Sequence, residues 1–296
     1  MLSNCNLSRT SVNFTYTIIH PYNTMLLAQI SDLHIKANGK KSYRVVDTAA
    51  SLRRCVAHIL ALKQQPDAIV ITGDLVDFGQ PDEYAYLREL LLPLSMPYYL
   101  IAGNHDERGA LRAAFPDHSW MAGRGERIEY VIDTHALRIV ALDTVIPKQS
   151  GGHLAPESVA WLAATLAKAP DTPTVVIMHH PPFATGIGHM DRIGVDNPQN
   201  LEAVIARHPQ VERVLCGHLH RSIQKRFGGS IASTCPSPAH QLQLDLSFDA
   251  PPRFVMEPPG YQLHLWSPTL GLVSHTMVIG NFDGPYPFYD GDNLSD

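Results

Sequence analysis

Short apolar runs alternate with amphipathic stretches along most of this chain. Apolar runs without polar alternation predict buried strands at residues 25–30, 67–72, 97–102, 174–178 and 211–217. Apolar residues at the helical period, with suitable ends, predict helices at residues 45–64, 82–92, 156–168 and 198–207. Buried strands separated by helices are typical of a mostly parallel sheet that is covered on both faces.

Two parts of the chain depart from this alternation. Residues 127–133 and 137–143 are strand-like runs joined by a short link, which predicts a β-hairpin. After residue 221, short strands broken by Gly and Pro predict antiparallel additions. We therefore predict an α/β fold, a four-layer α/β/β/α sandwich of two mixed sheets flanked by helices.

Composition and charge indicate which binding partners and which cellular compartment to expect. The chain has 296 residues, of which 45% are apolar and 17% charged, with a formal net charge of −5. Because this charge is negative and no Lys/Arg run occurs, we expect neither nucleic acid nor a membrane as a partner. No apolar run is long enough for a transmembrane helix. The four cysteines lack CxxC spacing, which favours a reducing compartment, and we expect a cytoplasmic protein.

Residues that can bind metal follow five of the predicted strands, at the point where each strand ends. The carboxyl ends of the strands are where α/β sheets bind ligands, so these side chains are expected to meet in one metal site. The clusters hold Asp32 and His34; Asp74 and Asp77; Asn104, His105 and Asp106; His179 and His180; and His218 and His220.

Spacing indicates which of these residues can act together. In an extended chain the side chains at i and i+2 share a face, so Asp32 and His34 are expected to converge on one ion. His218 and His220 likewise share a face and suit one ion or two neighbouring ions. Adjacent residues point to opposite faces, so only one of the pair at 179 and 180 is expected to be a ligand, and alternation does not select which.

The chemical types of the donor groups limit which metal ions suit this site. Imidazole, carboxylate and amide donors without thiolate suit Fe, Mn, Zn or Co better than Ca or Mg. This number of donors fits two divalent transition-metal ions better than one. A pair of ions stabilises both the attacking and the leaving oxygen in displacement at phosphorus. With two carboxylates and a bridging hydroxide the pair keeps a net charge of about +1 and attracts a phosphate ester.

The ordered motifs resemble the calcineurin-like metallophosphoesterase superfamily across roughly residues 25–225. Within it, the HHPP block and the segment MDRIGVDNPQNL are most similar to the bacterial class III cyclic nucleotide phosphodiesterase and glycerophosphodiesterase group. The motifs that carry the resemblance are Asp32-Leu33-His34, Gly73-Asp74-Leu75-Val76-Asp77, Gly103-Asn104-His105-Asp106, His179 and Gly217-His218-Leu219-His220.

The resemblance implies a role for each of these residues. It implies that one metal is held by Asp32, His34 and His220, that Asp74 bridges, and that a second metal is held by Asn104, His179 and His218. It selects His179 over His180, which is left for packing or for contact with the substrate. Asp77 and Asp106 resemble positions that orient the ligands or the chain.

The function that follows is hydrolysis of a small phosphodiester, either a 3′,5′-cyclic nucleotide or a glycerophosphodiester. We expect in-line attack by a metal-bound hydroxide, with His105 protonating the departing alkoxide. The alternatives are a phosphomonoesterase or nucleotide pyrophosphatase of the same superfamily, or a non-catalytic interaction module on the same scaffold.

The predicted domain organisation has three parts. Residues 1–24 are expected to be a poorly ordered N-terminal extension, and residues 25–245 a metallophosphoesterase catalytic domain. Residues 246–296 are expected to form a C-terminal loop and antiparallel strands that act as a cap or an oligomer contact, so we expect a homo-oligomer.

Overall fold

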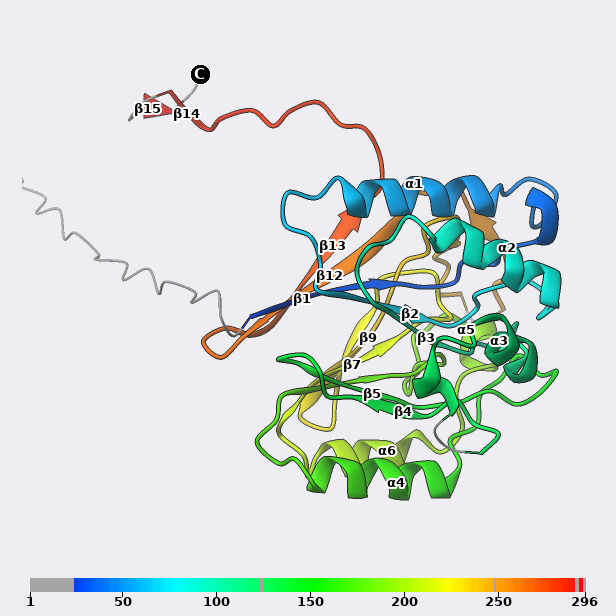
Figure 1. Ribbon diagram of the computed structural model, residues 1–296, viewed down its shortest axis with the longest axis vertical. Coiled ribbons are helices and arrows are strands. Elements are labelled where there is room, and N and C mark those ends of the chain that lie inside the picture. Colours follow the sequence, from blue (N-terminus) through cyan, green and yellow to red (C-terminus); the bar gives the residue numbers. More distant parts are fainter. Residues whose placement is uncertain (1–23, 123–124, 248, 291–292, 295–296) are drawn as a thin grey trace, which may run out of the picture.

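Two stacked β-sheets with helices on their outer faces make up the protein (Figure 1). The computed structural model describes residues 24–122, 125–247, 249–290 and 293–294. The expected N-terminal extension, apart from Thr24, lies outside these residues. The arrangement confirms the predicted four-layer sandwich of two mixed sheets. Within the described part of the chain, no helix combines the length and the apolar character needed to span a membrane.

The first sheet has the strand order β13-β12-β1-β2-β3. Its parallel strands are β1 (Met25–Ile30), β2 (Ala68–Thr72) and β3 (Tyr98–Ile101), and the helices α1 (Thr48–Leu60) and α2 (Pro81–Leu91) cover its outer face (Figure 1). Helix α1 is shorter than the predicted range of 45–64. It starts after Asp47, whose carboxylate accepts a hydrogen bond from Ala50 N at 2.9 Å and so caps the helix.

The second sheet has the order β4-β5-β6-β7-β9-β8. The predicted hairpin is confirmed, since β4 (Tyr130–Ile132) pairs antiparallel with β5 (Arg138–Ala141). The strands β6 (Thr174–Ile177) and β7 (Val211–Cys216) continue the sheet in parallel, followed by β9 (Ser230–Thr234) and β8 (Gln224–Phe227). Helices α4 (Pro156–Ala167) and α6 (Pro198–Ile205) cover the outer face of this sheet (Figure 1).

Short elements occupy the loops between these strands. They are α3 (Arg108–Ala114), α5 (Gly188–Asp191), the 3-10 turns Ala37–Gly39 and Ser119–Ala122, the ribbon of β10 (Gln241–Leu242) and β11 (Phe254–Val255), and the pair of β14 (Tyr289–Asp290) and β15 (Asn293–Leu294). No predicted element corresponds to α3, because a helix of seven residues that includes Gly109 has too little periodicity to be recognised.

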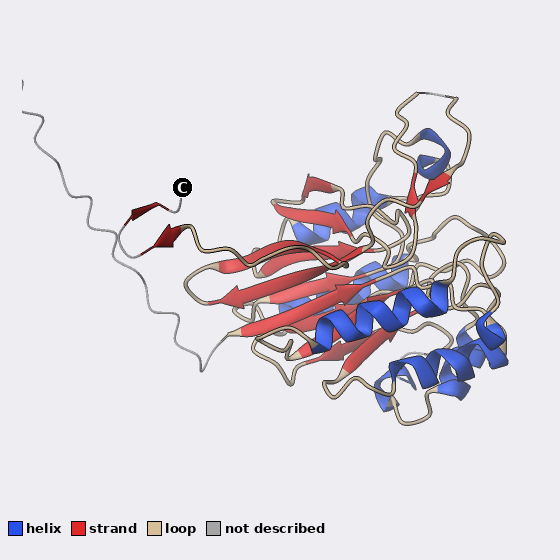
Figure 2. Ribbon diagram, turned by 90° about the horizontal axis from the view of Figure 1, so that it is seen from above, coloured by secondary structure: helices blue, strands red, loops and turns tan. Residues whose placement is uncertain are grey.

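Part of the C-terminal segment is built into the first sheet. The strand β12 (Gly260–Ser267) pairs antiparallel with β1, and β13 (Gly271–Val278) pairs antiparallel with β12. The predicted boundary after residue 245 therefore does not separate these strands from the sheet that carries the first motif. Beyond β13 the chain leads away from the body of the protein (Figures 1 and 2).

The hydrophobic core has two main parts. One cluster joins buried side chains of β1, β2 and β3 to side chains of β5 and β6 between the sheets, and to side chains of α1 and α2 on the outer face of the first sheet. The other joins the second sheet to α4 and α6. This packing holds the carboxyl ends of β1, β2, β3, β6 and β7 against one another, which is where the predicted metal ligands follow.

His264 on β12 is fully buried, and its Nε2 lies 3.2 Å from Gln29 Oε1. Burial, together with the charges of Arg213 and His275, lowers its pKa to about 3. In the unfolded chain an imidazole titrates near pH 6.5, so the unfolded state binds the proton first as the pH falls. The neutral imidazole therefore contributes stability above about pH 6.5, and this stability is lost as the pH falls toward about 3.

We expect the substitution His264→Gln to make unfolding less sensitive to acid. Between about pH 7.5 and about pH 5, the wild type should lose about 2 kcal/mol more unfolding free energy than the variant, since one pKa unit corresponds to about 1.4 kcal/mol. Urea unfolding of both metal-free proteins at the two pH values measures the difference. Equal losses would contradict this assignment.

Candidate metal centre

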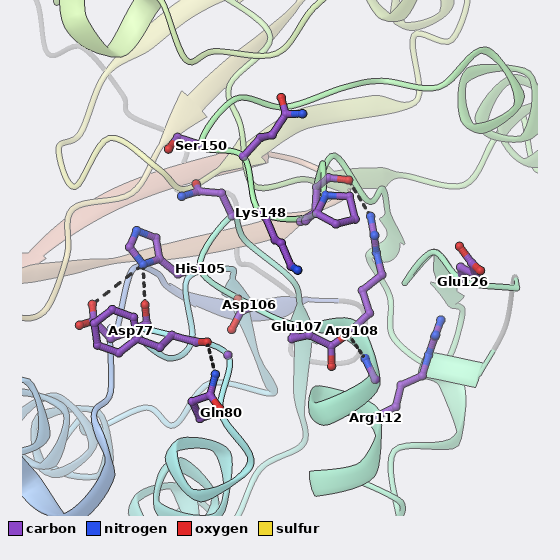
Figure 3. A pocket seen from close by; sticks show the side chains of 17 residues that line it. Asp77, Gln80, His105, Asp106, Glu107, Arg108, Arg112, Glu126, Lys148 and Ser150 are labelled. Atoms are coloured by element: carbon purple, nitrogen blue, oxygen red, sulfur yellow. Dashed lines mark hydrogen bonds and ion pairs between the residues drawn. The ribbon is translucent and has the colours of Figure 1, made fainter.

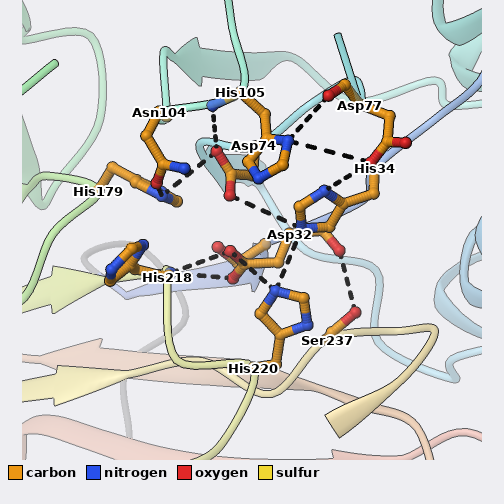
Figure 4. A network of polar contacts seen from close by, with 12 residues as sticks. Asp32, His34, Asp74, Asp77, Asn104, His105, His179, His218, His220 and Ser237 are labelled. Carbon is orange, nitrogen blue, oxygen red and sulfur yellow. Dashed lines mark hydrogen bonds and ion pairs between the residues drawn. The ribbon is translucent and has the colours of Figure 1, made fainter. Parts of the chain in front are cut away.

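The loops after β1, β2, β3, β6 and β7 meet at one end of the two sheets and bring the predicted ligands together (Figure 4). Nearly all of these side chains are buried; His105 is 32% exposed. The residues that Figure 4 labels include every predicted ligand: Asp32, His34, Asp74, Asn104, His179, His218 and His220.

The backbone at these positions differs from the extended chain that we assumed. Asp32 and His34 have φ angles of 57° and 46°, and His218 and His220 have φ angles of 70° and 48°. These values lie in the left-handed region, so alternation across a strand does not explain why the side chains converge. The prediction that these side chains converge through strand alternation is therefore wrong in its physical reason. Tight turns after the strands, which L-residues adopt at a cost, place these side chains instead.

Two glycines allow the loops to approach one another closely. A Cβ at Gly103 would collide with the backbone nitrogen and the carboxylate of Asp74. A Cβ at Gly217 would collide with Ser31 Oγ and Thr72 O. Glycine is therefore required, for a steric reason, before Asn104 in the loop after β3 and before His218 in the loop after β7.

One group of donors is formed by Asp32, His34 and His220, whose ligand atoms lie within 4.8 Å of one another. The Nε2 atoms of His34 and His220 are 3.1 Å apart. The Nδ1 of His220 donates to His240 O at 3.1 Å, and the Nδ1 of His34 lies 3.4 Å from Asp77 Oδ1. The contact with His240 O places the ring proton of His220 on Nδ1, so the lone pair of its Nε2 faces Nε2 of His34.

A second group of acceptor atoms surrounds His179. Its Nδ1 donates to Thr72 O at 2.8 Å, which leaves a lone pair on Nε2. That atom faces two oxygens, Asn104 Oδ1 at 3.1 Å and Asp74 Oδ1 at 3.4 Å. The Nε2 of His218 is buried and has no hydrogen-bond partner among the described residues.

Asp74 lies between the two groups. Its Oδ1 faces His179 and accepts a hydrogen bond from His105 N at 2.9 Å, while its Oδ2 lies 3.6 Å from His34 Nε2. Asp32 is held by the backbone N–H of His218, which donates to both carboxylate oxygens at 3.0 and 3.1 Å. The two carboxylates thus lie at the centre of the donor set (Figure 4).

This arrangement fits divalent cations. Buried lone pairs that face one another repel unless a cation lies between them. Burial lowers the pKa values of His218 and His220 well below the usual value, which keeps them in the neutral form that binds metal. At His179 burial also lowers the pKa, but Asp74 outweighs it and raises the pKa to about 9, so this carboxylate attracts positive charge to Nε2.

His180 is fully buried beside the centre but is satisfied by other partners. Its Nε2 donates to Ser150 O at 3.1 Å, and its Nδ1 accepts from Thr144 Oγ1 at 2.8 Å. Burial and the charge of His179 lower its pKa to about 3, so the ring is neutral. Although its ligand atoms lie within 4.8 Å of those of His179 and His218, both of its nitrogens are already engaged.

Asp106, Asp77 and His105 connect the loops. Asp106 accepts hydrogen bonds from Gly103 N at 2.8 Å, Leu75 N at 3.1 Å and Tyr84 Oη at 2.9 Å. It thereby links the loop after β2 to the loop after β3. The Nδ1 of His105 donates to the backbone oxygen of Asp77 at 2.8 Å. His105 lies beside His34, with ring centroids 4.7 Å apart.

A cleft of about 800 Å³ opens beside His105 (Figure 3). The cleft is lined by residues of the loops after β2, β3 and β5, among them Asn104, His105, Arg108, Lys148 and Ser150. The cleft is large enough for a small organic phosphate and reaches the predicted metal ligands through Asn104.

Several residues of this site have no signal in the sequence. Thr144 and Ser150 hold His180 from a loop without a recognisable motif. The ring of His240, which the sequence places outside any motif, lies 4.5 Å from that of His220. Lys36 forms an ion pair with Asp77 at 3.1 Å, and its position two residues after His34 is the one signal that could have indicated it.

Comparison with known proteins agrees with the geometry. Residues 25–222 match the calcineurin-like phosphoesterase family. The chain belongs to this family, whose members are hydrolases that use divalent metal ions. The fold is similar to that of a dimetal phosphatase from Danio rerio, with a TM-score of 0.58 and 15% identity, over 86% of this chain and 99% of that one.

Curated relatives resemble the chain over most of its length. A probable glycerophosphodiester phosphodiesterase, GpdQ, of Arcobacter nitrofigilis is 41% identical over 270 residues, which cover 90% of this chain and 97% of the relative. The 3′,5′-cyclic adenosine monophosphate phosphodiesterase CpdA of Pseudomonas aeruginosa is 32% identical over 219 residues, which cover 74% of this chain and 78% of the relative. Both relatives are named as phosphodiesterases.

Proposed function

We propose that this chain is a phosphodiesterase with a binuclear metal centre that hydrolyses small diesters, either 3′,5′-cyclic nucleotides or glycerophosphodiesters. The observation that carries the proposal is the position of Asp74, whose two oxygens face two separate groups of buried acceptor atoms. The names of the relatives, a glycerophosphodiester phosphodiesterase and a cyclic nucleotide phosphodiesterase, support the substrate class.

The residues present would hold two ions. One would be held by Asp32, His34 and His220, the other by Asn104, His179 and His218, with Asp74 shared between them. Since the donors are imidazole, carboxylate and amide groups, Fe, Mn, Zn and Co are suitable metals. When bound, the ions supply Lewis acidity, which neutralises charge on the phosphate and lowers the pKa of a water molecule.

His105 is positioned to move a proton at the leaving oxygen. Because its Nδ1 donates to the backbone oxygen of Asp77, Nε2 is the nitrogen that can take up and release a proton. The residue is part of the lining of the cleft and is the most exposed imidazole of the centre. The Asp77 carboxylate lies 4.0 Å from Nδ1 of this ring.

Asp77 and Asp106 act by positioning these groups. The Asp77 carboxylate lies beside the Nδ1 atoms of both His34 and His105, and Lys36 holds it in place. Asp106 fixes the backbone of the loops that carry Asp74 and Asn104. Their loss would loosen the ligands without removing a donor atom.

The two adjacent histidines give a contrasting pair of variants. We expect His179→Ala to lose one bound metal per chain, because Nε2 of His179 faces Asp74 and Asn104. We expect His180→Ala to keep both metals, because its nitrogens bond Thr144 and Ser150 instead. Metal analysis of the purified variants, normalised to protein, measures this. Loss of metal from the His180 variant alone would show that the assignment is reversed.

Hydrolysis assays test the activity itself. The metal-free protein should not hydrolyse bis(p-nitrophenyl) phosphate, and added Mn²⁺ or Co²⁺ should restore turnover. Cyclic AMP, glycerophosphoethanolamine and a phosphomonoester, compared at equal concentration, then separate a diesterase from a monoesterase. Absence of turnover with every metal would favour a non-catalytic interaction module.

We also propose a cytoplasmic location and self-association. Within the described part of the chain Cys55, Cys216 and Cys235 are free thiols, which agrees with a reducing compartment. The strand β13 forms one edge of its sheet and leaves much of its surface exposed, which offers a surface for a second copy. Light scattering after size-exclusion chromatography tests the second point, and a monomer mass would contradict it.

A further inference from the structure

A row of aromatic rings leads away from the metal centre on the side of His220. The ring of His240 lies 4.5 Å from that of His220 and 5.8 Å from that of His34. Tyr43 and Phe254 pack on His240 at 5.3 and 5.2 Å and on each other at 5.2 Å. None of these three rings belongs to a family motif or to the cleft beside His105.

Tyr43 is held in a strained conformation by a loop that is anchored on a predicted ligand. Its φ is 47° and that of Arg44 is 66°, in the left-handed region that bulky residues avoid. Ser42 and Val46 exchange two backbone hydrogen bonds of 2.9 Å across the turn, and Ser42 Oγ donates to His34 O at 3.2 Å. The loop thus fixes this tyrosine relative to the metal centre at a cost in backbone strain.

Phe254 is presented from the opposite direction by the β10-β11 ribbon. It pairs with Leu242 in that ribbon, and the guanidinium of Arg221, one residue after His220, donates to Leu242 O. Arg221 also forms an ion pair with Glu257 at 2.7 Å, beyond β11. The ribbon is therefore tied to the loop that carries a predicted metal ligand.

The rings of His240 and Tyr43 differ in their exposure to solvent and in their contacts. His240 is 2% exposed, yet its Nδ1 has no hydrogen-bond partner among the described residues. Tyr43 is 49% exposed, although its ring has two aromatic neighbours. An exposed aromatic face beside a buried polar atom without a partner is what a ligand with a flat ring would cover.

We propose that Tyr43, Phe254 and His240 form an aromatic subsite that binds a ring-bearing substituent of the phosphodiester, with Tyr43 as the residue that determines specificity. The inference rests on the proposed function and names its substrate class: a diester that carries a nucleobase or aryl group. A glycerophosphodiester with a small polar head group offers no flat face to these rings.

The phenol also suits this position chemically. Partial burial of the phenol, followed by the carboxylates of Asp77, Asp74 and Asp32, raises the pKa of Tyr43 to about 12. The hydroxyl therefore stays protonated at neutral pH, and it lies within electrostatic reach of the metal-binding carboxylates. A neutral hydroxyl adds no repulsion toward an anionic phosphate.

The test compares substrates with and without a ring. In Tyr43→Leu, KM for cyclic AMP should rise about tenfold, the effect of losing one base-aromatic stack, while kcat changes little. KM for glycerophosphoethanolamine should stay within about twofold of the wild-type value. Tyr43→Phe is the matched control that keeps the ring, and its KM for cyclic AMP should stay close to that of the wild type. Phe254→Leu should act in the same direction as Tyr43→Leu.

Binding of the products separates this inference from the proposed function. Calorimetry with 5′-AMP and glycerol 3-phosphate should give a Kd that rises about tenfold for 5′-AMP alone in Tyr43→Leu. Equal changes for both ligands, or none, in both leucine variants would overturn the subsite, whereas a wild type without diesterase activity would overturn the proposed function. Unchanged metal content and circular dichroism establish that a variant is folded.

Discussion

Replacing Asp74 by asparagine is expected to reduce hydrolysis of bis(p-nitrophenyl) phosphate by roughly 10³-fold or more. The substitution keeps the shape of the side chain and an oxygen that can accept the hydrogen bond from His105 N. It removes the negative charge that lies between the two groups of donors. Without that charge, two divalent ions held close together repel each other more strongly.

Metal content should fall together with activity in this variant. We expect one ion or fewer per chain, because the carboxylate faces both His34 and His179. Asp171→Asn is a matched control, since Asp171 is exposed in the turn between α4 and β6. That control should retain both metals and full activity. An Asp74→Asn protein with two ions and wild-type turnover would contradict a shared carboxylate.

Replacing His105 by alanine is expected to affect the reaction according to the leaving group. For a diester with an alkoxide leaving group, kcat should fall by roughly 10² to 10⁴, the usual contribution of a general acid. For bis(p-nitrophenyl) phosphate the loss should be much smaller, because p-nitrophenolate departs without being protonated. Both metals should remain, since His105 contributes only its backbone N–H to Asp74.

The comparison of leaving groups distinguishes proton transfer from a structural effect. A structural disturbance would slow both substrates by the same factor and would release metal. His135→Ala is a suitable control, because that imidazole contacts Tyr99 Oη at 2.9 Å, away from the centre. An equal fall in kcat for both substrates in His105→Ala would contradict the role of this residue as a general acid.

The order of strands and helices could be predicted because it depends on local periodicity. The apolar runs before Asp32, Asp74, Asn104, His179 and His218 all form buried strands, as predicted. The position of β12 could not be predicted, because it depends on pairing between Met25 and Trp266, which are far apart in the sequence. Helix ends also differ, since caps such as Asp47 override the periodicity.

The sequence predicts which residues form the candidate site, but it predicts less of the backbone geometry that places them. The seven predicted ligands come together, but through left-handed turns at Asp32, His34 and His218 and not through strand alternation. Residues such as Tyr43, His240 and Ser150 could not be predicted, since only the tertiary structure brings them to the centre. A motif specifies the donor atoms, whereas the groups that orient them come from loops without a common pattern.

Titration of the metal-free protein with Mn²⁺ tests the central claim most directly. Bound metal and hydrolysis of bis(p-nitrophenyl) phosphate are measured in the same samples. A binuclear centre built on Asp74 predicts no activity without metal and full activity only when two ions are bound per chain. Full activity with a single bound ion, or without any metal, would contradict it.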